Sequence, residues 1–269
     1  MPSSNADAAE TGVNLRGRTE HTTRAQPSGT ASAPIAARLL ALDWNRIARD
    51  LDGQGWATTG PLLTPEECER LAALYDSDAP FRSRVVMARH GFGQGEYRYF
   101  AYPLPDTVAA LRRHLYARLV PTAESWRERL GQAGTDAYPA DHEDYLGRCH
   151  AAGQMRPTPL LLRYGPGDYN CLHQDLYGEL AFPLQAAFLL SEPGRGFEGG
   201  EFVLTEQRPR MQSRVHVVPL QQGEAAIFAV NQRPVQGARG SYRVIMRHGV
   251  SPLRAGRRHT LGIIFHDAA

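Results

Sequence analysis

Three residues of this chain have the types and spacing of a metal site: His173, Asp175 and the distant His248. In an extended strand, residues i and i+2 point to the same face, so the side chains of His173 and Asp175 can converge on one ion. Two imidazoles and one carboxylate form the open-sided ligand set of non-heme Fe(II) oxygenases, which leaves positions for a co-substrate and O2. The pattern therefore predicts an Fe(II) site with His248 as third ligand, and the same three residues as its catalytic centre.

An arginine follows the distal histidine at position 258. Residues 242–250 and 258–265 both have the composition of β-strands, and the intervening residues 251–256 contain Pro and Gly. A hairpin centred near Leu253 would place His248 beside Arg258. Arginine is an always-charged, bidentate partner for the far carboxylate of a keto acid whose other end binds the metal.

The elements that must position these residues fall into three parts. Residues 1–35 are rich in Ser, Thr, Ala, Gly and Pro, and we expect a disordered tail. Residues 36–157 are mainly helical, with helices expected after Thr64, from about 105 to 130 with an interruption near Pro121, and from about 140 to 152. Residues 158–269 contain short β-rich runs separated by Gly and Pro, typical of a jelly roll. The sequence predicts one α+β domain with a jelly-roll core and N-terminal supporting helices.

The ligand pattern and its flanking segments resemble the 2-oxoglutarate and Fe(II) dependent dioxygenases of the prolyl-4-hydroxylase type. In that family His-x-Asp is followed by a distal His and, about ten residues later, by an Arg or Lys that holds the 2-oxoglutarate C5 carboxylate. Residues 160–167, 199–202 and 219–228 look like the family's other strands. The stretch from about 148 to 267 is similar to a prokaryotic oxygenase family whose predicted role is oxidative demethylation of damaged nucleic acid.

The resemblance implies a double-stranded β-helix (jelly-roll, cupin-like) core at 158–269, with Fe(II) as cofactor and 2-oxoglutarate and O2 as co-substrates. It implies hydroxylation of a C–H bond with release of succinate and CO2. Tyr164 matches a tyrosine of the family pattern that can donate a hydrogen bond to 2-oxoglutarate, although a core tyrosine with a satisfied hydroxyl is the alternative. Thr260 lies two residues beyond Arg258, on the same strand face, and can support the same carboxylate.

A predicted β-hairpin joins residues 85–89 and 96–100 around a Gly-rich tip. Related oxygenases carry a hairpin over the metal site in this part of the chain. By that resemblance Arg89, Tyr97 and Arg98 are candidates for substrate contact.

Other histidines offer rival ligand sets. His142 and Asp144 also form His-x-Asp, but they fall in a predicted helix, where i and i+2 are about 200° apart, so a solvated helical face is expected. Isolated histidines at 216, 259 and 266 are interpreted as structural or surface residues. Cys171, beside the site, is expected to be a small buried thiol.

The substrate is the least determined part of the prediction. Arginines cluster at 239–258 and at 208, 210 and 214, and such a surface can hold phosphates. However, all 30 Lys+Arg positions are arginine, so arginine is common everywhere in this chain. The alkylated-base repair dioxygenases usually show Arg-x-Asn-x-Thr-x-Arg after the distal histidine, and here the asparagine and second arginine are missing. Alkylated nucleic acid and a protein side chain of the prolyl type therefore both stay open as substrates, with a non-catalytic jelly-roll binding module as a remote alternative.

Composition limits the remaining possibilities. The net charge of +2 does not by itself indicate a nucleic-acid binder. The three cysteines argue against a disulfide-stapled secreted fold, and no membrane span or signal-peptide core is recognisable. We expect a cytoplasmic protein without a membrane partner, and nothing in the sequence indicates its oligomeric state.

Overall fold

The computed structural model describes residues 33–132 and 136–269. The expected disordered tail lies almost entirely outside the described residues. The helices are α1 (Ile35–Leu40), α2 (Trp44–Gln54), α3 (Pro65–Ala73), α4 (Asp106–Arg129) and α5 (His142–Ala151), with 3-10 turns η1 (Leu74–Asp76) and η2 (Met87–Arg89).

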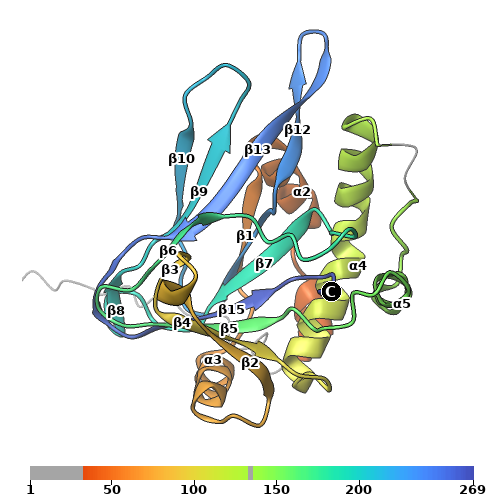
Figure 1. Ribbon diagram of the computed structural model, residues 1–269. Coiled ribbons are helices and arrows are strands. Elements are labelled where there is room, and N and C mark those ends of the chain that lie inside the picture. Colours follow the sequence, from red (N-terminus) through yellow and green to blue (C-terminus); the bar gives the residue numbers. More distant parts are fainter. Residues whose placement is uncertain (1–32, 133–135) are drawn as a thin grey trace, which may run out of the picture.

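Two antiparallel sheets form the body of the molecule (Figure 1). The seven-stranded sheet has the order β1 (Trp56–Pro61), β11 (Glu224–Ala229), β7 (Leu184–Leu189), β15 (Arg258–Ile263), β5 (Leu160–Tyr164), β4 (Glu96–Phe100) and β2 (Phe81–Val86). The six-stranded sheet has the order β10 (Arg214–Val218), β9 (Phe202–Gln207), β13 (Gly240–Val250), β6 (Tyr169–His173) and β3 (Gly93–Gln94), with β12 (Gln232–Gly237) paired to β13. A two-stranded sheet joins β14 (Leu253–Gly256) to β8 (Phe197–Gly199). The predicted α+β jelly roll is confirmed.

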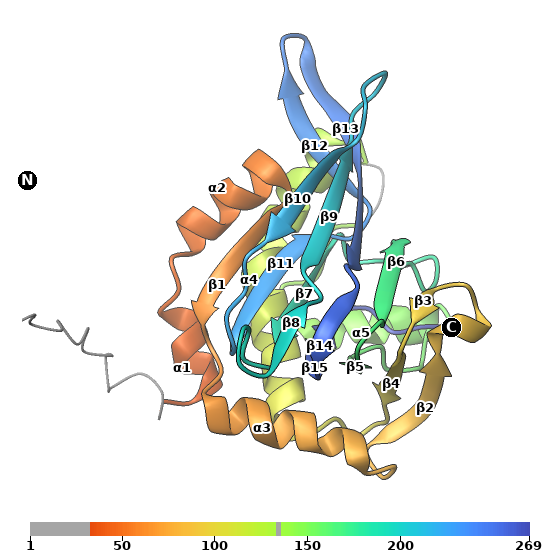
Figure 2. The same cartoon turned by 90° about the vertical axis from the view of Figure 1, so that its left-hand side faces the viewer.

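The burial of the strands reflects how helices and sheets pack on one another. Every residue of β7, with the sequence LQAAFL, is buried, as expected of a strand covered on both faces. Helices α2 and α4 contact β1 and β15 of the seven-stranded sheet (Figure 2). Three strands that precede residue 157, β1, β2 and β4, extend this sheet, so the N-terminal half supplies strands as well as supporting helices.

Helix α3 begins as its sequence predicts. The Thr64 side chain accepts from the Glu67 backbone N–H, and the Glu67 carboxylate accepts from the Thr64 N–H, which completes a capping box. The predicted interruption of the long helix at Pro121 is wrong, because α4 is continuous through that residue. Its buried face, from Val108 to Trp126, packs on the core, and tertiary packing outweighs the backbone hydrogen bond that the proline removes.

The hairpin predicted around Leu253 does not form. Strand β13 pairs with β6, β9 and β12, whereas β15 pairs with β5 and β7 in the other sheet. Between them the chain turns a corner through β14, where Gly256 has φ +80° and a Cβ atom would lie 2.2 Å from the Gly196 carbonyl oxygen. His248 and Arg258 therefore occupy opposite sheets and are not hairpin neighbours.

Candidate metal and co-substrate site

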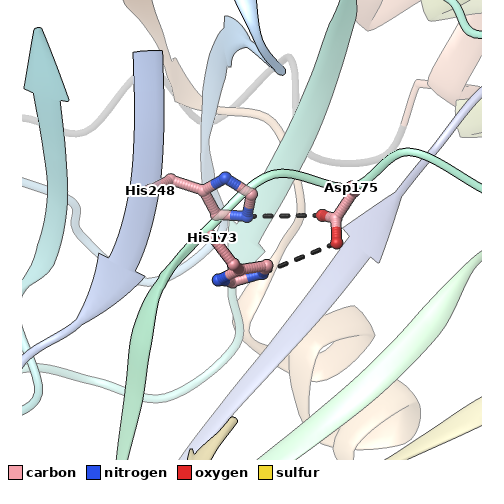
Figure 3. Close-up of side chains that lie close together, drawn as sticks. All are labelled: His173, Asp175 and His248. Atoms are coloured by element: carbon pink, nitrogen blue, oxygen red, sulfur yellow. Dashed lines mark ion pairs between the residues drawn. The ribbon is translucent and has the colours of Figure 1, made fainter. Parts of the chain in front are cut away.

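The three predicted metal ligands come together from two strands and a following loop (Figure 3). His173 ends β6 and pairs with His248 of β13, while Asp175 lies two residues beyond the strand. The Asp175 carboxylate lies 3.5 Å from His173 Nε2 and 3.3 Å from His248 Nε2. Within the described residues, this is the one group of three or more His, Cys, Asp or Glu side chains arranged to hold a metal ion.

The imidazole of His173 is held in the tautomer that a metal ligand needs. Its Nδ1 donates to the backbone carbonyl of Cys171 at 2.7 Å. The proton is then on Nδ1, so the lone pair of Nε2 is directed toward Asp175 and the shared site. The prediction that Cys171 is a buried thiol is wrong, because this residue of β6 is exposed.

Two residues that the sequence analysis missed fix the carboxylate of Asp175. The Tyr177 hydroxyl donates to Asp175 Oδ1 at 2.6 Å, and the Gln185 amide donates to Oδ2 at 2.8 Å and lies 3.3 Å from His248 Nε2. Burial raises the pKa of Asp175, but the hydrogen bonds and the neighbouring histidines outweigh burial and hold the pKa well below its usual range. The carboxylate is thus ionised and oriented before any ligand binds.

The His248 side chain is held in place by neighbouring aromatic rings. Its ring lies 4.7 Å from the ring of Phe228 and 4.2 Å from that of His173, measured between centroids. Burial, reinforced by the nearby His173, lowers the pKa of His248, so its imidazole is neutral. A neutral imidazole is the form that binds a metal ion.

A cavity of about 290 Å³ connects this cluster to Arg258. Its lining includes all three predicted ligands and also Tyr97, Tyr164, Gln185, Arg258 and Thr260. Two of its apolar lining residues, Phe92 and Leu172, are about half exposed, which indicates that the cavity opens to solvent beside them. His248 and Arg258 therefore line the same cavity from different sheets and are not neighbours in a hairpin.

Arg258 is a buried cation without a carboxylate partner among the described residues. It is 1% exposed, its Nη1 donates to Thr260 Oγ1 at 2.6 Å, and its Nε has no hydrogen-bond partner. Burial lowers the pKa of Arg258, although an arginine stays charged in proteins. An isolated charge of this kind is costly to bury, so the geometry fits an anionic group that enters the cavity.

Tyr164 lies beside this arginine, since β5 pairs Tyr164 with Arg258 of β15. Burial raises the pKa of Tyr164 to about 12, so its hydroxyl is a neutral donor at physiological pH. The side chain of Asn170 lies near that hydroxyl, but no hydrogen bond of ordinary geometry forms within the described residues. The alternative of a core tyrosine with a satisfied hydroxyl is therefore not supported.

The three candidate substrate residues have different positions. Tyr97 lines the cavity. Arg98 lies on the other face of β4, where it binds Asp78 and stacks on Tyr75, so the structure does not bring it to the site. Arg89 is exposed at the hairpin tip and does not line the cavity.

The rival histidines lie away from the metal cluster. His142 does begin a helix, but the expected solvated face is wrong, because the residue is 4% exposed and its Nε2 pairs with the Phe265 carbonyl oxygen. His266 is also buried, and its Nδ1 accepts from the Phe182 N–H. His216 packs near Trp56, and His259 near Tyr75. Each histidine is thus accounted for by packing.

A jelly roll with a His-Asp-His cluster at one end of a cavity and an unpaired arginine at the other defines an oxygenase of the 2-oxoglutarate and Fe(II) class. Residues 95–268 match the model of a family described as "Oxygenase, catalysing oxidative methylation of damaged DNA". The chain belongs to this oxygenase family.

Individual proteins are also similar to this chain. Two Mycobacterium tuberculosis proteins, "Uncharacterized protein Rv2227" of strain H37Rv and "Uncharacterized protein MT2286" of strain CDC 1551, are each 48% identical over 170 residues, covering 63% of this chain and 72% of the relative. A prolyl hydroxylase from Trichoplax adhaerens, solved with a hypoxia inducible factor peptide, has a TM-score of 0.50 at 14% identity and covers 82% of this chain and 87% of its own. That last likeness shows the shared fold. None of the described helices is long and apolar enough to span a membrane.

Proposed function

We propose that this oxygenase uses Fe(II) and 2-oxoglutarate to remove methyl groups oxidatively from damaged nucleic acid. The observation that carries the proposal is the pairing, in one cavity, of a three-ligand cluster with a buried arginine that lacks an anion. The family description supports the choice of damaged DNA as substrate. Oxidation of a methyl group leads to its removal, because a hydroxylated N-methyl group is an unstable hemiaminal.

Each part of the cavity has a distinct task in this proposal. His173, Asp175 and His248 would hold Fe(II), and Arg258 with Thr260 would bind the far carboxylate of 2-oxoglutarate, to which the Tyr164 hydroxyl would donate. When bound, iron with 2-oxoglutarate supplies the oxidising power to insert one oxygen atom of O2 into a C–H bond. The apolar walls exclude water and the entrance aims the substrate methyl group.

The overall reaction balances without a further reductant. One oxygen atom of O2 enters succinate as 2-oxoglutarate loses CO2, and the other converts the N-methyl group to N-hydroxymethyl. Transfer of the hydroxyl proton to the ring nitrogen then breaks the C–N bond and releases formaldehyde. Formaldehyde is therefore the diagnostic product.

The test offers the protein an oligonucleotide with one N-methylated base, together with Fe(II), 2-oxoglutarate and O2. We expect one formaldehyde per succinate, none from the unmethylated oligonucleotide and none from His173→Ala. A cell-extract peptide library is treated in parallel and examined for the gain of one oxygen atom. Formaldehyde from the oligonucleotide supports the proposal, whereas peptide oxidation alone would replace it with protein side-chain hydroxylation.

A binding measurement separates the enzyme from a non-catalytic module. Anaerobic addition of Fe(II) and 2-oxoglutarate should produce a metal-to-ligand charge-transfer absorption that is lost in His173→Ala. If the wild-type protein shows no such absorption, the iron and 2-oxoglutarate assignments are both wrong.

A further inference from the structure

Positive charge is concentrated in one part of this chain. Residues 207–266 contain ten of the 30 arginines but one of the 28 acidic residues, a net charge of +9, so the rest of the chain carries −7. Because arginine replaces lysine everywhere here, a high arginine count alone would mean little. The near absence of acidic residues over the same 60 positions cannot be explained by that replacement.

Two hairpins carry much of this charge. Strands β9 and β10 are joined by residues 208–213, and β12 and β13 by a tight turn between Gly237 and Gly240. Figures 1 and 2 both show the two hairpins projecting from the same end of the body. They are joined at their base, because β9 and β13 pair with each other.

Five arginines on these hairpins, named here the hairpin arginines, are exposed. None of them makes an ion pair or a side-chain hydrogen bond within the described residues. They are Arg210 and Arg214 on the first hairpin and Arg239, Arg243 and Arg247 on the second. Buried arginines of the same region behave differently, since Arg233 binds the buried Glu206. Unpaired, exposed cations are free to bind an external anion.

Strand alternation places the second-hairpin arginines on one side. Val244, Met246 and His248 are buried, so Arg243 and Arg247 lie on the outer face of the six-stranded sheet. The row from Arg239 to Arg247 runs about 26 Å at ~3.3 Å per residue, and its last member directly precedes a predicted metal ligand.

We propose that three of the hairpin arginines, Arg239, Arg243 and Arg247 of the second hairpin, form a docking surface for the phosphate backbone of a nucleic-acid strand. Its length matches about eight nucleotides at ~3.4 Å each. The row ends at the part of β13 that carries His248, so a nucleic-acid strand held there brings neighbouring bases toward the adjacent strand β6 and its exposed Leu172. This inference rests on the proposed function and adds to it the surface that selects nucleic acid over peptide.

The test measures binding of a fluorescein-labelled single-stranded 20-nucleotide DNA by anisotropy between 50 and 200 mM salt. We expect Arg243→Gln with Arg247→Gln to weaken binding roughly tenfold and to reduce the salt slope by about 1.4, since each single-strand phosphate contact contributes ~0.7. The matched control is Arg70→Gln with Arg118→Gln, two exposed arginines of α3 and α4. This control changes the net charge equally and should leave both quantities close to wild type.

The outcomes separate this surface from the demethylation activity. Equal losses in both double variants would mean that net charge alone acts, and the docking surface would be overturned. If the Arg243/Arg247 variant binds DNA as tightly as wild type and still releases formaldehyde, the docking surface is overturned and the proposed function stands. Hairpin-dependent DNA binding without any formaldehyde would support the surface and reject the demethylation. A polyglutamate peptide that competes as well as DNA would overturn the choice of partner.

Discussion

Two fully buried arginines, Arg112 and Arg258, have opposite surroundings. Arg112 on α4 donates to the Ile264 and His266 carbonyl oxygens and forms an ion pair of 2.8 Å with Asp267. Arg258 on β15 donates to Thr260 and has no ion pair with any described carboxylate. The first region holds the C-terminal end of the chain against α4, and the second lines the cavity.

The difference shows which cation belongs to the fold and which to a ligand. An unpaired buried ion costs several kcal/mol in a real protein, and a good ion pair with further hydrogen bonds offsets that cost. Arg112 receives this compensation from the protein itself. Arg258 lacks it, so the free energy that burial costs there can be recovered when a carboxylate binds.

The largest effect should come from breaking the paired region. Asp267→Asn leaves the buried Arg112 without its counterion, and we expect the free energy of unfolding to fall by about 3–5 kcal/mol. Arg258→Met removes a cation that has no partner, so its free energy of unfolding without 2-oxoglutarate should equal or exceed that of wild type. Urea denaturation of both variants checks the contrast, and a larger loss in Arg258→Met would reverse our interpretation.

The second effect concerns the cavity alone. Arg258→Met should raise the Kd for 2-oxoglutarate by roughly 100-fold, because a buried charge pair is lost from the complex. Anaerobic calorimetry with Fe(II) measures this binding, and Fe(II) affinity without 2-oxoglutarate serves as the internal control. If Fe(II) binding weakens in parallel, Arg258 supports the fold of the site and does not select the co-substrate.

Local pattern explains why the metal cluster was predictable. The spacing of His173 and Asp175 fixes their shared direction within one short segment, and no distant pairing is required. Arg258 and His248 do line one cavity, but the hairpin predicted to bring them together is wrong, because strand partners depend on contacts far apart in the sequence. The residue pattern near a site can thus be right while the topology inferred from it is wrong.

Tertiary packing determines the surroundings of the residues that local sequence patterns could not place. His142 was expected in solvent, but α5 turns it against Phe265, 123 residues away. Gln185 carried one usable signal, a polar side chain in the otherwise apolar strand β7. Its contact with Asp175 could not be inferred, since it depends on which strand faces which across the cavity.

Gln185 allows a third test, on the metal end of the cavity. Gln185→Leu removes the hydrogen bond to Asp175 Oδ2 while keeping the volume of the side chain close to wild type. We expect Fe(II) affinity to fall about 10- to 100-fold, as is typical when a residue that orients a metal ligand is lost. Tyr177→Phe, which removes the bond to Oδ1, should act in the same direction. Anaerobic Fe(II) titration measures both, and unchanged affinity would show that Asp175 is positioned by its backbone alone.

The smallest predicted effect is a pH dependence of the paired region. Burial, reinforced by Arg112, lowers the pKa of His142 and of His266 to about 4, below the usual value of 6.5. Between these values the unfolded chain binds a proton that the folded chain rejects, so stability falls as the pH drops from 6.5 toward 4. Each histidine should cost about 1 kcal/mol between pH 7 and 5.5. Burial raises the pKa of Asp267, but Arg112 and His150 outweigh burial and lower it. The Asp267 carboxylate therefore keeps its contribution to stability between pH 7 and 5.5 and loses that contribution as the pH falls below about 3.8. Urea denaturation of wild type and His142→Gln at pH 7 and 5.5 checks this, and an unchanged slope in the variant would mean that His142 titrates normally in the folded protein.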